Sequence, residues 1–267
     1  MDLADRSGSR TIRVDGLVNA RDLGGLRRLD GTLTPKGVFY RSENVDRVTK
    51  HGWEQLYSEG VRTVVDLRQA RERESDTSTR PSWLTSVQVD LDGLDNQEFW
   101  KDYWDNGLAG TALYFLPHLR AMPERAGAAL SAVVAAPPGG VLFHCMGGRD
   151  RTGMVAMLLL AAVGTEPNEV VDDYLETVRL GDARAASANR NNPEPEIETL
   201  CRQHGTTTED AFRAAVEGLE LATLLTKALG ERERRALIPW RGTLRPIQTS
   251  WSSGGHSRSM PSGGTPA

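Results

Sequence analysis

One stretch of the sequence places a thiol where an anion could bind. Residues 141–153 read VLFHCMGGRDRTG, in which an apolar run ends at Cys145 and a short polar loop leads to Thr152. A buried strand that turns tightly into a helix N-terminus directs unpaired backbone N–H groups and the helix dipole toward one point. The field that holds a phosphate there also stabilises a thiolate. We therefore predict that Cys145 is a nucleophile directed at phosphorus.

The residues after Cys145 supply the other groups that this chemistry needs. Arg151 follows the thiol by six positions, and its planar guanidinium suits bidentate binding of phosphate oxygens. We expect Thr152 to hydrogen-bond the sulfur as it leaves. The loop residues expected to surround the phosphate are Met146, Gly147, Gly148, Arg149, Thr152 and Gly153.

The second cysteine is an internal control for this spacing, because Cys201 has Thr207 where Cys145 has Arg151. The alternative interpretation of Cys145 is a buried core thiol, which is common for free cysteine. The conjunction of an apolar strand, His144, two glycines, the arginine and Thr-Gly favours the catalytic interpretation.

The motif His-Cys-x5-Arg-Thr-Gly resembles the signature of the cysteine-based tyrosine and dual-specificity phosphatases. Its fuller form is similar to that of a bacterial tyrosine phosphatase family whose loop usually reads HCxxGKDRTG, and whose members also accept phosphoinositides. Three more segments match that family in order, namely Asn19–Gly25, Tyr40–Ser42 and Val65–Arg68. Arg149 stands where the family has lysine. This keeps the charge but leaves a lipid preference open.

The resemblance implies roles for further residues. The family carries an aspartate inside the loop, which matches Asp150 and would protonate the leaving oxygen and then activate water. Asp92, near the end of a predicted strand, is the alternative acid. His144 is expected to orient the loop by hydrogen bonding. Arg21 and Asp22 are expected to brace it, or else to form an exposed ion pair in a turn.

An aromatic segment follows Asp92. Phe99, Trp100, Tyr103 and Trp104 fall on one face of a helix predicted within residues 96–106. Packing onto the domain is the favoured interpretation. The alternative is a lid over the site, formed by residues near 93–110.

Composition limits the class of protein. The chain has 267 residues and a net charge of −4, so a basic nucleic-acid surface is not expected. Two cysteines argue against a disulfide framework. The five histidines show no metal-ligand spacing, so neither a metal nor another cofactor is expected. With no signal peptide or membrane-length apolar run, we expect a cytoplasmic enzyme, although export without a signal would leave no trace.

The order of elements predicts an α/β fold. Strands near Val38, Val61, Val87 and Val141 alternate with helices, which indicates a mostly parallel sheet of four to five strands flanked by helices, as in the tyrosine phosphatases. Residues 11–14 could add a strand. We predict a flexible segment at 1–10, one phosphatase domain at 11–240 with Trp240 docked on it, and a disordered tail at 241–267.

The C-terminal half is predicted to be helical. Apolar spacing predicts helices over 152–163 and 165–180, a polar loop over 185–192, and a helix over 194–204. Thr206 to Glu209 is interpreted as a capping box that begins one helix continuing to about residue 229. Earlier in the chain, the charged run 68–74 is interpreted as the solvated start of a helix.

These residues together predict a phosphomonoester hydrolase, with a tyrosine-phosphatase activity of single or dual specificity. Its partner would be a phosphorylated protein or a small phosphomonoester, and the oligomeric state is left open. The alternatives are a phosphoinositide phosphatase with the same mechanism, a silent phosphate-binding module, and a sulfur transferase or arsenate reductase. The presence of nucleophile, arginine and threonine together disfavours the silent module.

Overall fold

A five-stranded sheet organises the molecule. The computed structural model describes residues 10–237 and Trp240, so the predictions for residues 1–9 and 241–267 lie outside the described residues. The strand order is β1-β2-β5-β3-β4, and only β1 runs antiparallel to its neighbour. The strands are β1 (Arg21–Asp22), β2 (Phe39–Ser42), β3 (Val61–Asp66), β4 (Thr85–Gln88) and β5 (Gly140–His144).

Both faces of the sheet are buried, which explains its apolar strands. Side chains alternate between two hydrophobic clusters, so that Val141 and Phe143 of β5 point into one cluster and Leu142 points into the other. Trp53 and Leu56 of α1 (Lys50–Ser58) belong to the smaller cluster. The helices thus cover the sheet on both sides.

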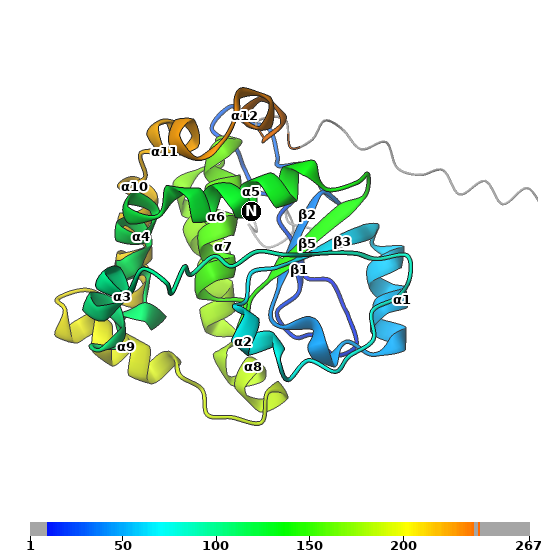
Figure 1. Cartoon of the computed structure of the whole chain (residues 1–267), viewed down its shortest axis with the longest axis horizontal. Helices are drawn as coiled ribbons and strands as arrows, with labels where there is room; N and C mark the ends of the chain where they lie inside the picture. Colours follow the sequence, from blue (N-terminus) through cyan, green and yellow to red (C-terminus); the bar gives the residue numbers. More distant parts are fainter. Residues whose placement is uncertain (1–9, 238–239, 241–267) are drawn as a thin grey trace, which may run out of the picture.

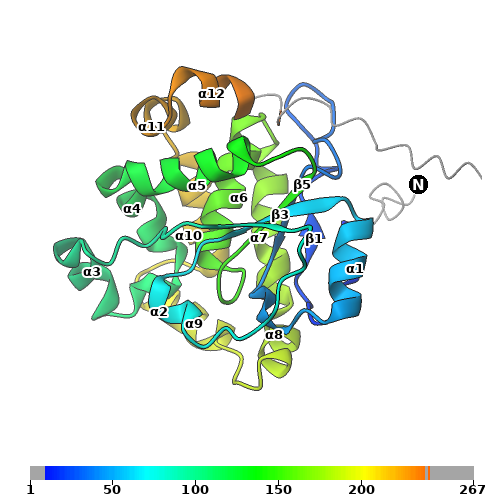
Figure 2. The ribbon, with the colours of Figure 1, turned by 45° about the vertical axis from the view of Figure 1, so that its right-hand side comes forward.

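Twelve α-helices surround the sheet within the described residues (Figure 1). Helix α1 lies on one side, and α5, α6 and α7 lie on the other (Figures 1 and 2). After α1 they are α2 (Ala70–Arg73), α3 (Gln97–Trp104), α4 (Phe115–Ala121), α5 (Pro123–Ala135), α6 (Asp150–Ala162), α7 (Pro167–Arg179), α8 (Gly181–Ser187), α9 (Glu194–Gln203), α10 (Thr208–Glu217), α11 (Leu221–Ala228) and α12 (Glu231–Leu237).

The predicted α/β class with a mostly parallel sheet is confirmed, and three local predictions are wrong. Residues 11–14 form isolated bridges instead of a strand. The predicted loop at 185–192 begins inside helix α8. The long helix predicted after residue 206 is two helices, because the chain breaks at Gly218. Its N-cap is Thr207, whose hydroxyl accepts from the Asp210 amide, and not Thr206.

Trp240 is docked on the domain as predicted. Its side chain is fully buried, and its indole N–H donates to the Leu159 carbonyl at 3.2 Å. The ring lies edge-on to Phe39 of β2, with 4.9 Å between the centroids. The chain therefore continues to contact the sheet after α12.

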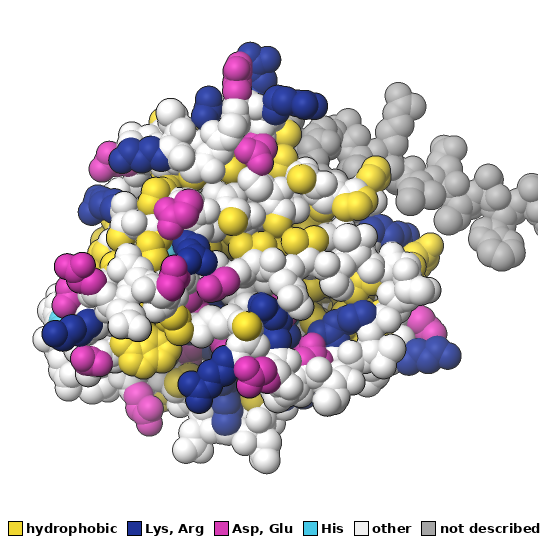
Figure 3. Space-filling model, in the orientation of Figure 1, with side chains coloured by type: hydrophobic (Ala, Val, Ile, Leu, Met, Phe, Trp, Pro, Cys, Tyr) yellow, Lys and Arg dark blue, Asp and Glu magenta, His cyan; other side chains and the backbone are white. Residues whose placement is uncertain are grey.

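The surface carries charges of both signs. On the face in Figure 3, basic and acidic side chains are interspersed, and a hydrophobic area lies beside α3 and α9 at the lower left. Among the described helices, none combines the length and the apolarity that crossing a membrane requires.

Candidate active site

Four strands deliver the candidate residues to one edge of the sheet. Because β2, β3, β4 and β5 are parallel, their carboxyl ends meet at the edge where such folds bind ligands. Cys145 follows β5 directly. Glu72 lies on α2 after β3, and Asp92 lies in the segment after β4. Sequence-distant groups therefore converge around the thiol.

The loop after Cys145 is held by its carbonyl groups. The carbonyls of His144 and Met146 accept from the amides of Leu67 and Asn44, at 2.8 and 3.0 Å. Three others accept from side chains. The Cys145 carbonyl bonds His144 Nδ1 at 3.1 Å. The Gly147 carbonyl bonds Arg184 Nη1 at 3.2 Å, and the Gly148 carbonyl bonds Arg41 Nη2 at 2.7 Å. Five consecutive carbonyls are thus fixed by groups around the loop.

The loop amides are left available for an anion. Within the described part of the chain, no carbonyl or side chain accepts from the amides of residues 146–149. Gly148 makes the turn possible: its φ is +68°, and a Cβ there would lie 2.5 Å from the Ser42 carbonyl oxygen. Free amides at the start of α6 are the groups that the predicted anion cradle requires.

Arg151 is paired with two acids on neighbouring elements. Its Nη2 donates to Glu72 Oε1 at 2.7 Å, and its Nη1 contacts Glu72 Oε2 and, at 3.1 Å, Asp92 Oδ2. Burial alone would lower the pKa of Arg151, but Glu72, the Cys145 charge and Asp92 together raise it well above its usual range. No acceptor among the described residues bonds Arg151 Nε. The Nε edge is therefore open to a phosphate oxygen.

Asp92 is the buried acid beside Arg151. Burial raises the pKa of Asp92, against the opposing effects of Arg151 and of a hydrogen bond from Gln69. The segment around Asp92 is held in place through its backbone. The Asp92 carbonyl accepts from Trp100 Nε1 at 3.0 Å and lies 3.2 Å from His118 Nε2. Asp92 is thus a weaker acid than an exposed aspartate because of its burial.

Arg149 occupies a different environment. Its Nε donates to both oxygens of Glu194, at 2.9 and 3.0 Å, and its Nη1 donates to Asp150 at 2.7 Å and to the Gly110 carbonyl at 2.9 Å. The side chain is 4% exposed. The Arg149 side chain therefore forms ion pairs within the protein, and Asp150 is held by Arg149.

A cluster of buried arginines supports the cysteine loop. Arg21 Nε and Arg41 Nη1 donate to the Asp173 carboxylate at 2.9 and 2.6 Å, and Arg41 also bonds the Gly148 carbonyl. Despite burial, which alone would raise it, the arginines hold the pKa of Asp173 well below its usual range. Burial lowers the pKa of Arg21 to about 10. Arg21 thus acts on the loop through Asp173.

Asp22 has another role in the structure. Its carboxylate accepts from the amides of Gly24 and Gly37, at 2.7 and 2.8 Å, and makes no contact with the loop among the described residues. Burial raises the pKa of Asp22. The exposed ion pair considered for Arg21 and Asp22 is wrong, because both side chains are buried.

The remaining predicted residues lie in the loop or beside it. His144 is fully buried, and burial lowers the pKa of its imidazole. A neutral ring with its proton on Nδ1 fits the hydrogen bond to the Cys145 carbonyl. Thr152 Oγ1 is buried without a hydrogen-bond partner among the described residues, and no bond to the sulfur is formed. Met146 is 38% exposed, and Gly153 packs against Tyr174.

Four residues of this site were not predicted. Glu72 and Arg68 fall in the run interpreted as a solvated helix start, yet Arg68 is fully buried and bonds Asp66 and Asp46. Glu194 and Asp173 are buried acids on helices. A buried acid facing an arginine far along the sequence leaves no local pattern. Of these four residues, only Arg68 has a signal in the sequence, because it belongs to the segment Val65–Arg68 that matches the phosphatase family.

The aromatic segment packs on the domain. Trp100 of α3 is 6% exposed, and Phe99 and Tyr103 contact the main core, whereas Trp104 is 58% exposed. The bond from Trp100 to the Asp92 carbonyl ties α3 to the candidate site. The packing interpretation thus describes three of the four aromatic residues.

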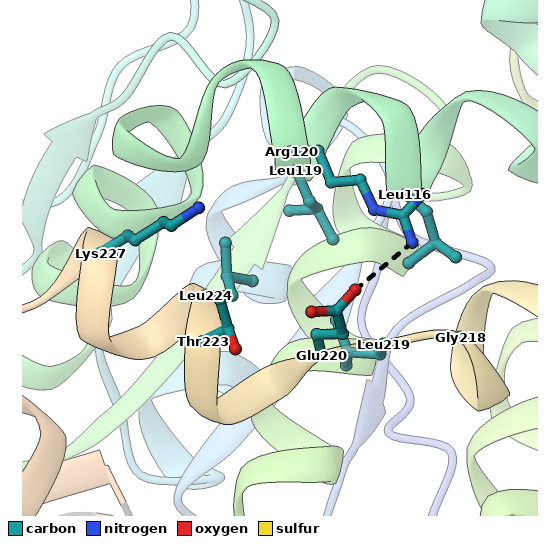
Figure 4. Close-up of a pocket in the computed structure, with 9 residues that line it drawn as sticks. All are labelled: Leu116, Leu119, Arg120, Gly218, Leu219, Glu220, Thr223, Leu224 and Lys227. Carbon is teal, nitrogen blue, oxygen red and sulfur yellow. Dashed lines mark ion pairs between the residues drawn. The ribbon is translucent and has the colours of Figure 1, made fainter.

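A separate hollow lies between α4 and α11 (Figure 4). Its volume is about 230 Å³, Leu116, Leu119 and Leu224 line it, and an ion pair of 3.8 Å joins Arg120 to Glu220 at its edge. None of its lining residues belongs to the cysteine loop. In the described residues, no cluster of three or more histidine, cysteine or acidic side chains could hold a metal ion.

Comparison with known proteins indicates the same family as the motif of the cysteine loop. A family model described as "Tyrosine phosphatase family" matches residues 12–223. A Cupriavidus necator protein whose name assigns it to the tyrosine-protein phosphatases is 30% identical over 195 residues, which cover 65% of each chain. A tyrosine-protein phosphatase of Nostoc commune is 29% identical over 147 residues, covering 54% of this chain and 49% of that one.

A third relative is the triple specificity protein phosphatase PtpB of Mycobacterium tuberculosis. It is 29% identical over 177 residues, covering 55% of this chain and 63% of PtpB. The chain thus spans between about half and two thirds of the length of these relatives. The family model covers the sheet, the cysteine loop and the acids around Arg151. The chain therefore belongs to the tyrosine phosphatase family.

Proposed function

We propose that the protein hydrolyses phosphotyrosine and related phosphomonoesters through a cysteinyl-phosphate intermediate. The observation that carries this proposal is that Cys145 opens a loop whose amides at residues 146–149 have no acceptor among the described residues, with Arg151 held next to it by Glu72 and Asp92. The amides and the Nε edge of Arg151 would bind the three equatorial phosphate oxygens. Such donors are preorganised for the charge of the transition state.

The reaction would proceed in two displacements. Cys145 Sγ forms a bond to phosphorus while the bond from phosphorus to the leaving oxygen breaks, and that oxygen takes a proton from an acid. Water then attacks phosphorus, the S–P bond breaks, and the same group takes the proton from the water. Protons and charges balance without another reactant.

Asp92 is the acid that we propose. It must begin the cycle protonated, and burial raises its pKa in that direction. Its Oδ2 lies 3.1 Å from Arg151 Nη1, next to the proposed phosphate position. Asp150, the acid that the family resemblance implies, instead bonds Arg149 at 2.7 Å. Because the leaving oxygen needs the protonated form, activity should fall as pH rises through the pKa of Asp92.

A protein substrate fits the site better than a phosphoinositide. Arg149 is buried against Glu194 and is not free to bind a second phosphate on a sugar ring. The names of the relatives describe tyrosine-protein and triple specificity phosphatases. The free thiols of Cys145 and Cys201 suit a reducing compartment, which supports a cytoplasmic location.

Aryl phosphate hydrolysis tests this function. The wild-type protein should hydrolyse a nitrophenyl phosphate at mildly acidic to neutral pH in the presence of a chelator, and Cys145→Ser should abolish turnover. Cys201→Ser is the matched control, since Cys201 lies on α9 outside the loop. Equal activity in the wild type and in Cys145→Ser would exclude thiolate catalysis. Loss of activity on chelation would exclude the metal-free mechanism.

A further inference from the structure

An exposed arginine borders the open side of the cysteine loop. A Cβ built at Gly147 would lie 3.2 Å from Arg184 Nη1 and 3.5 Å from Arg190 Nη2, so both guanidinium groups lie against this turn. Arg184 is buried and bonds Glu194 and the Gly147 carbonyl. Arg190 is exposed. The first arginine therefore belongs to the framework, and the second faces solvent beside the loop.

A second exposed arginine reaches the same place from another element. Arg47 ends the short 3-10 helix η2 (Val45–Arg47) that follows β2, and its Nη1 donates to the Ser187 carbonyl at the end of α8. The backbone amide of Arg190 bonds the Ala185 carbonyl of the same helix at 3.0 Å. Arg47 and Arg190 are thus both bonded to carbonyls of the last turn of α8, and Arg190 is the one whose guanidinium lies against Gly147.

The positive charge of these two side chains is not neutralised locally. The acids on the adjoining elements have other partners: Asp46 bonds Arg68 and Arg80, and Glu194 bonds Arg149 and Arg184. Among the described residues, no carboxylate forms an ion pair with Arg47 or Arg190. A protein of net charge −4 therefore keeps two unpaired cations beside its candidate catalytic loop.

We propose that Arg190 and Arg47 form a second anion subsite, which binds acidic side chains next to the phosphorylated residue of a protein substrate. This proposal rests on the proposed phosphatase function and adds a substrate preference to it. The two guanidinium groups are exposed and come from different elements, so they suit carboxylates carried on a flexible peptide. Exposed charges of this kind act mainly on association and on substrate choice.

A second phosphate on an inositol ring is the competing ligand. A ring phosphate would lie close to the cleaved one, where the adjacent loop cation is Arg149, and that cation is already paired with Glu194 and Asp150. The Arg190 guanidinium lies against Gly147 and Arg190 is exposed, so a neighbouring residue of a peptide can reach it. The geometry therefore favours an acidic peptide.

Matched phosphotyrosine peptides test the subsite. One peptide carries Asp and Glu beside the phosphotyrosine, and the other carries Asn and Gln at the same positions. We expect the wild type to prefer the acidic peptide by about 10-fold in kcat/KM at low salt, mainly through KM. The double variant Arg47→Gln with Arg190→Gln should lower this preference to about 2-fold or less. Added salt should reduce the wild-type preference in the same direction.

The control is Arg232→Gln. Arg232 is an exposed arginine on α12, which lies at the opposite end of the molecule from α8 (Figures 1 and 2). This variant should keep the full preference. A wild type without preference, or a double variant that keeps it, would overturn the proposal. So would a double variant that keeps the peptide preference but loses activity on a short-chain phosphatidylinositol bisphosphate, because the subsite would then bind a second phosphate.

Failure of the catalytic proposal is separable from failure of the subsite. If the wild type does not hydrolyse an aryl phosphate, the phosphatase proposal fails, and the subsite is then measured by binding. Fluorescence anisotropy of the two labelled peptides with Cys145→Ser should give a Kd about 10-fold lower for the acidic peptide. Equal Kd values, or a difference that survives Arg47→Gln with Arg190→Gln, would overturn the subsite.

Discussion

Arg149 and Arg151 are two positions apart at the start of α6, and each is paired with one glutamate and one aspartate. Arg149 bonds Glu194 and Asp150, while Arg151 bonds Glu72 and Asp92. The two arginines differ in which of their N–H groups remain without a partner among the described residues. Arg149 is 4% exposed, and its unpartnered Nη2 is buried. Arg151 keeps its Nε edge available and is influenced by the charge of Cys145.

The comparison shows that pairing with acids does not decide the role of an arginine. The Arg149 pairs join the loop to α9 across 45 residues and serve the framework. The Arg151 pairs hold one end of the guanidinium while the other edge stays open, so they orient the edge that we propose for phosphate binding. Changing each partner in turn should separate the two roles.

The largest effect is expected at the glutamates. Glu194→Gln removes the carboxylate that serves both Arg149 and Arg184, and leaving buried cations unpaired should lower the free energy of unfolding by about 3–5 kcal/mol. Glu72 is 24% exposed, so Glu72→Gln should cost about 1 kcal/mol or less. Urea unfolding measures both. Equal losses would mean that the two pairs are structurally equivalent.

The arginines themselves should show the reverse order in activity. Arg151→Lys removes the planar fork that binds phosphate, and we expect kcat/KM on an aryl phosphate to fall about 10²–10³-fold. Arg149→Lys should weaken the Glu194 pair and lower the melting temperature, with a loss of activity below about 5-fold. Steady-state kinetics at a temperature where both variants are folded gives the answer. A larger loss of kcat/KM for Arg149→Lys than for Arg151→Lys would indicate that Arg149 contacts the substrate.

The aspartates should differ by the smallest factor. Asp92→Asn should lower kcat by about 10²-fold on an alkyl phosphate, whose leaving group needs a proton, and much less on a nitrophenyl ester. The decline of kcat at higher pH should also disappear in this variant, because the deprotonation that causes it is removed. Asp150→Asn should change the two substrates alike. If Asp150→Asn instead shows the leaving-group dependence, Asp150 is the acid.

The sequence was sufficient for the elements that depend on local pattern. The strands around Val61 and Val141 and the helix predicted over 152–163 follow from apolar runs, and the structure contains them. The chemistry of the loop could be predicted for the same reason, since Cys145 and Arg151 are close in sequence. Helix α8 was missed because Ala185–Asn192 was judged by its polarity, whereas alanines at 183, 185 and 186 favour a helix.

The partners of the loop could not be found in this way. Glu72 and Asp92 are 79 and 59 residues from Arg151, and Glu194 is 45 residues from Arg149. Each pair depends on how α2, the segment after β4 and α9 pack together. In sequence, Glu72 is one charge in a charged run and resembles a solvated residue. Only its ion pair with Arg151 separates it from its neighbours.

The five anchored carbonyls of the loop have a consequence for how the protein folds. Their donors lie at positions between Arg41 and Arg184, so the loop cannot take its shape until most of the chain has assembled. Contacts between such distant residues form late, because closing long loops is entropically costly. An incompletely synthesised chain therefore carries Cys145 without the loop around it. During refolding, turnover should return with the last cooperative step, which makes catalysis itself a reporter of completed folding.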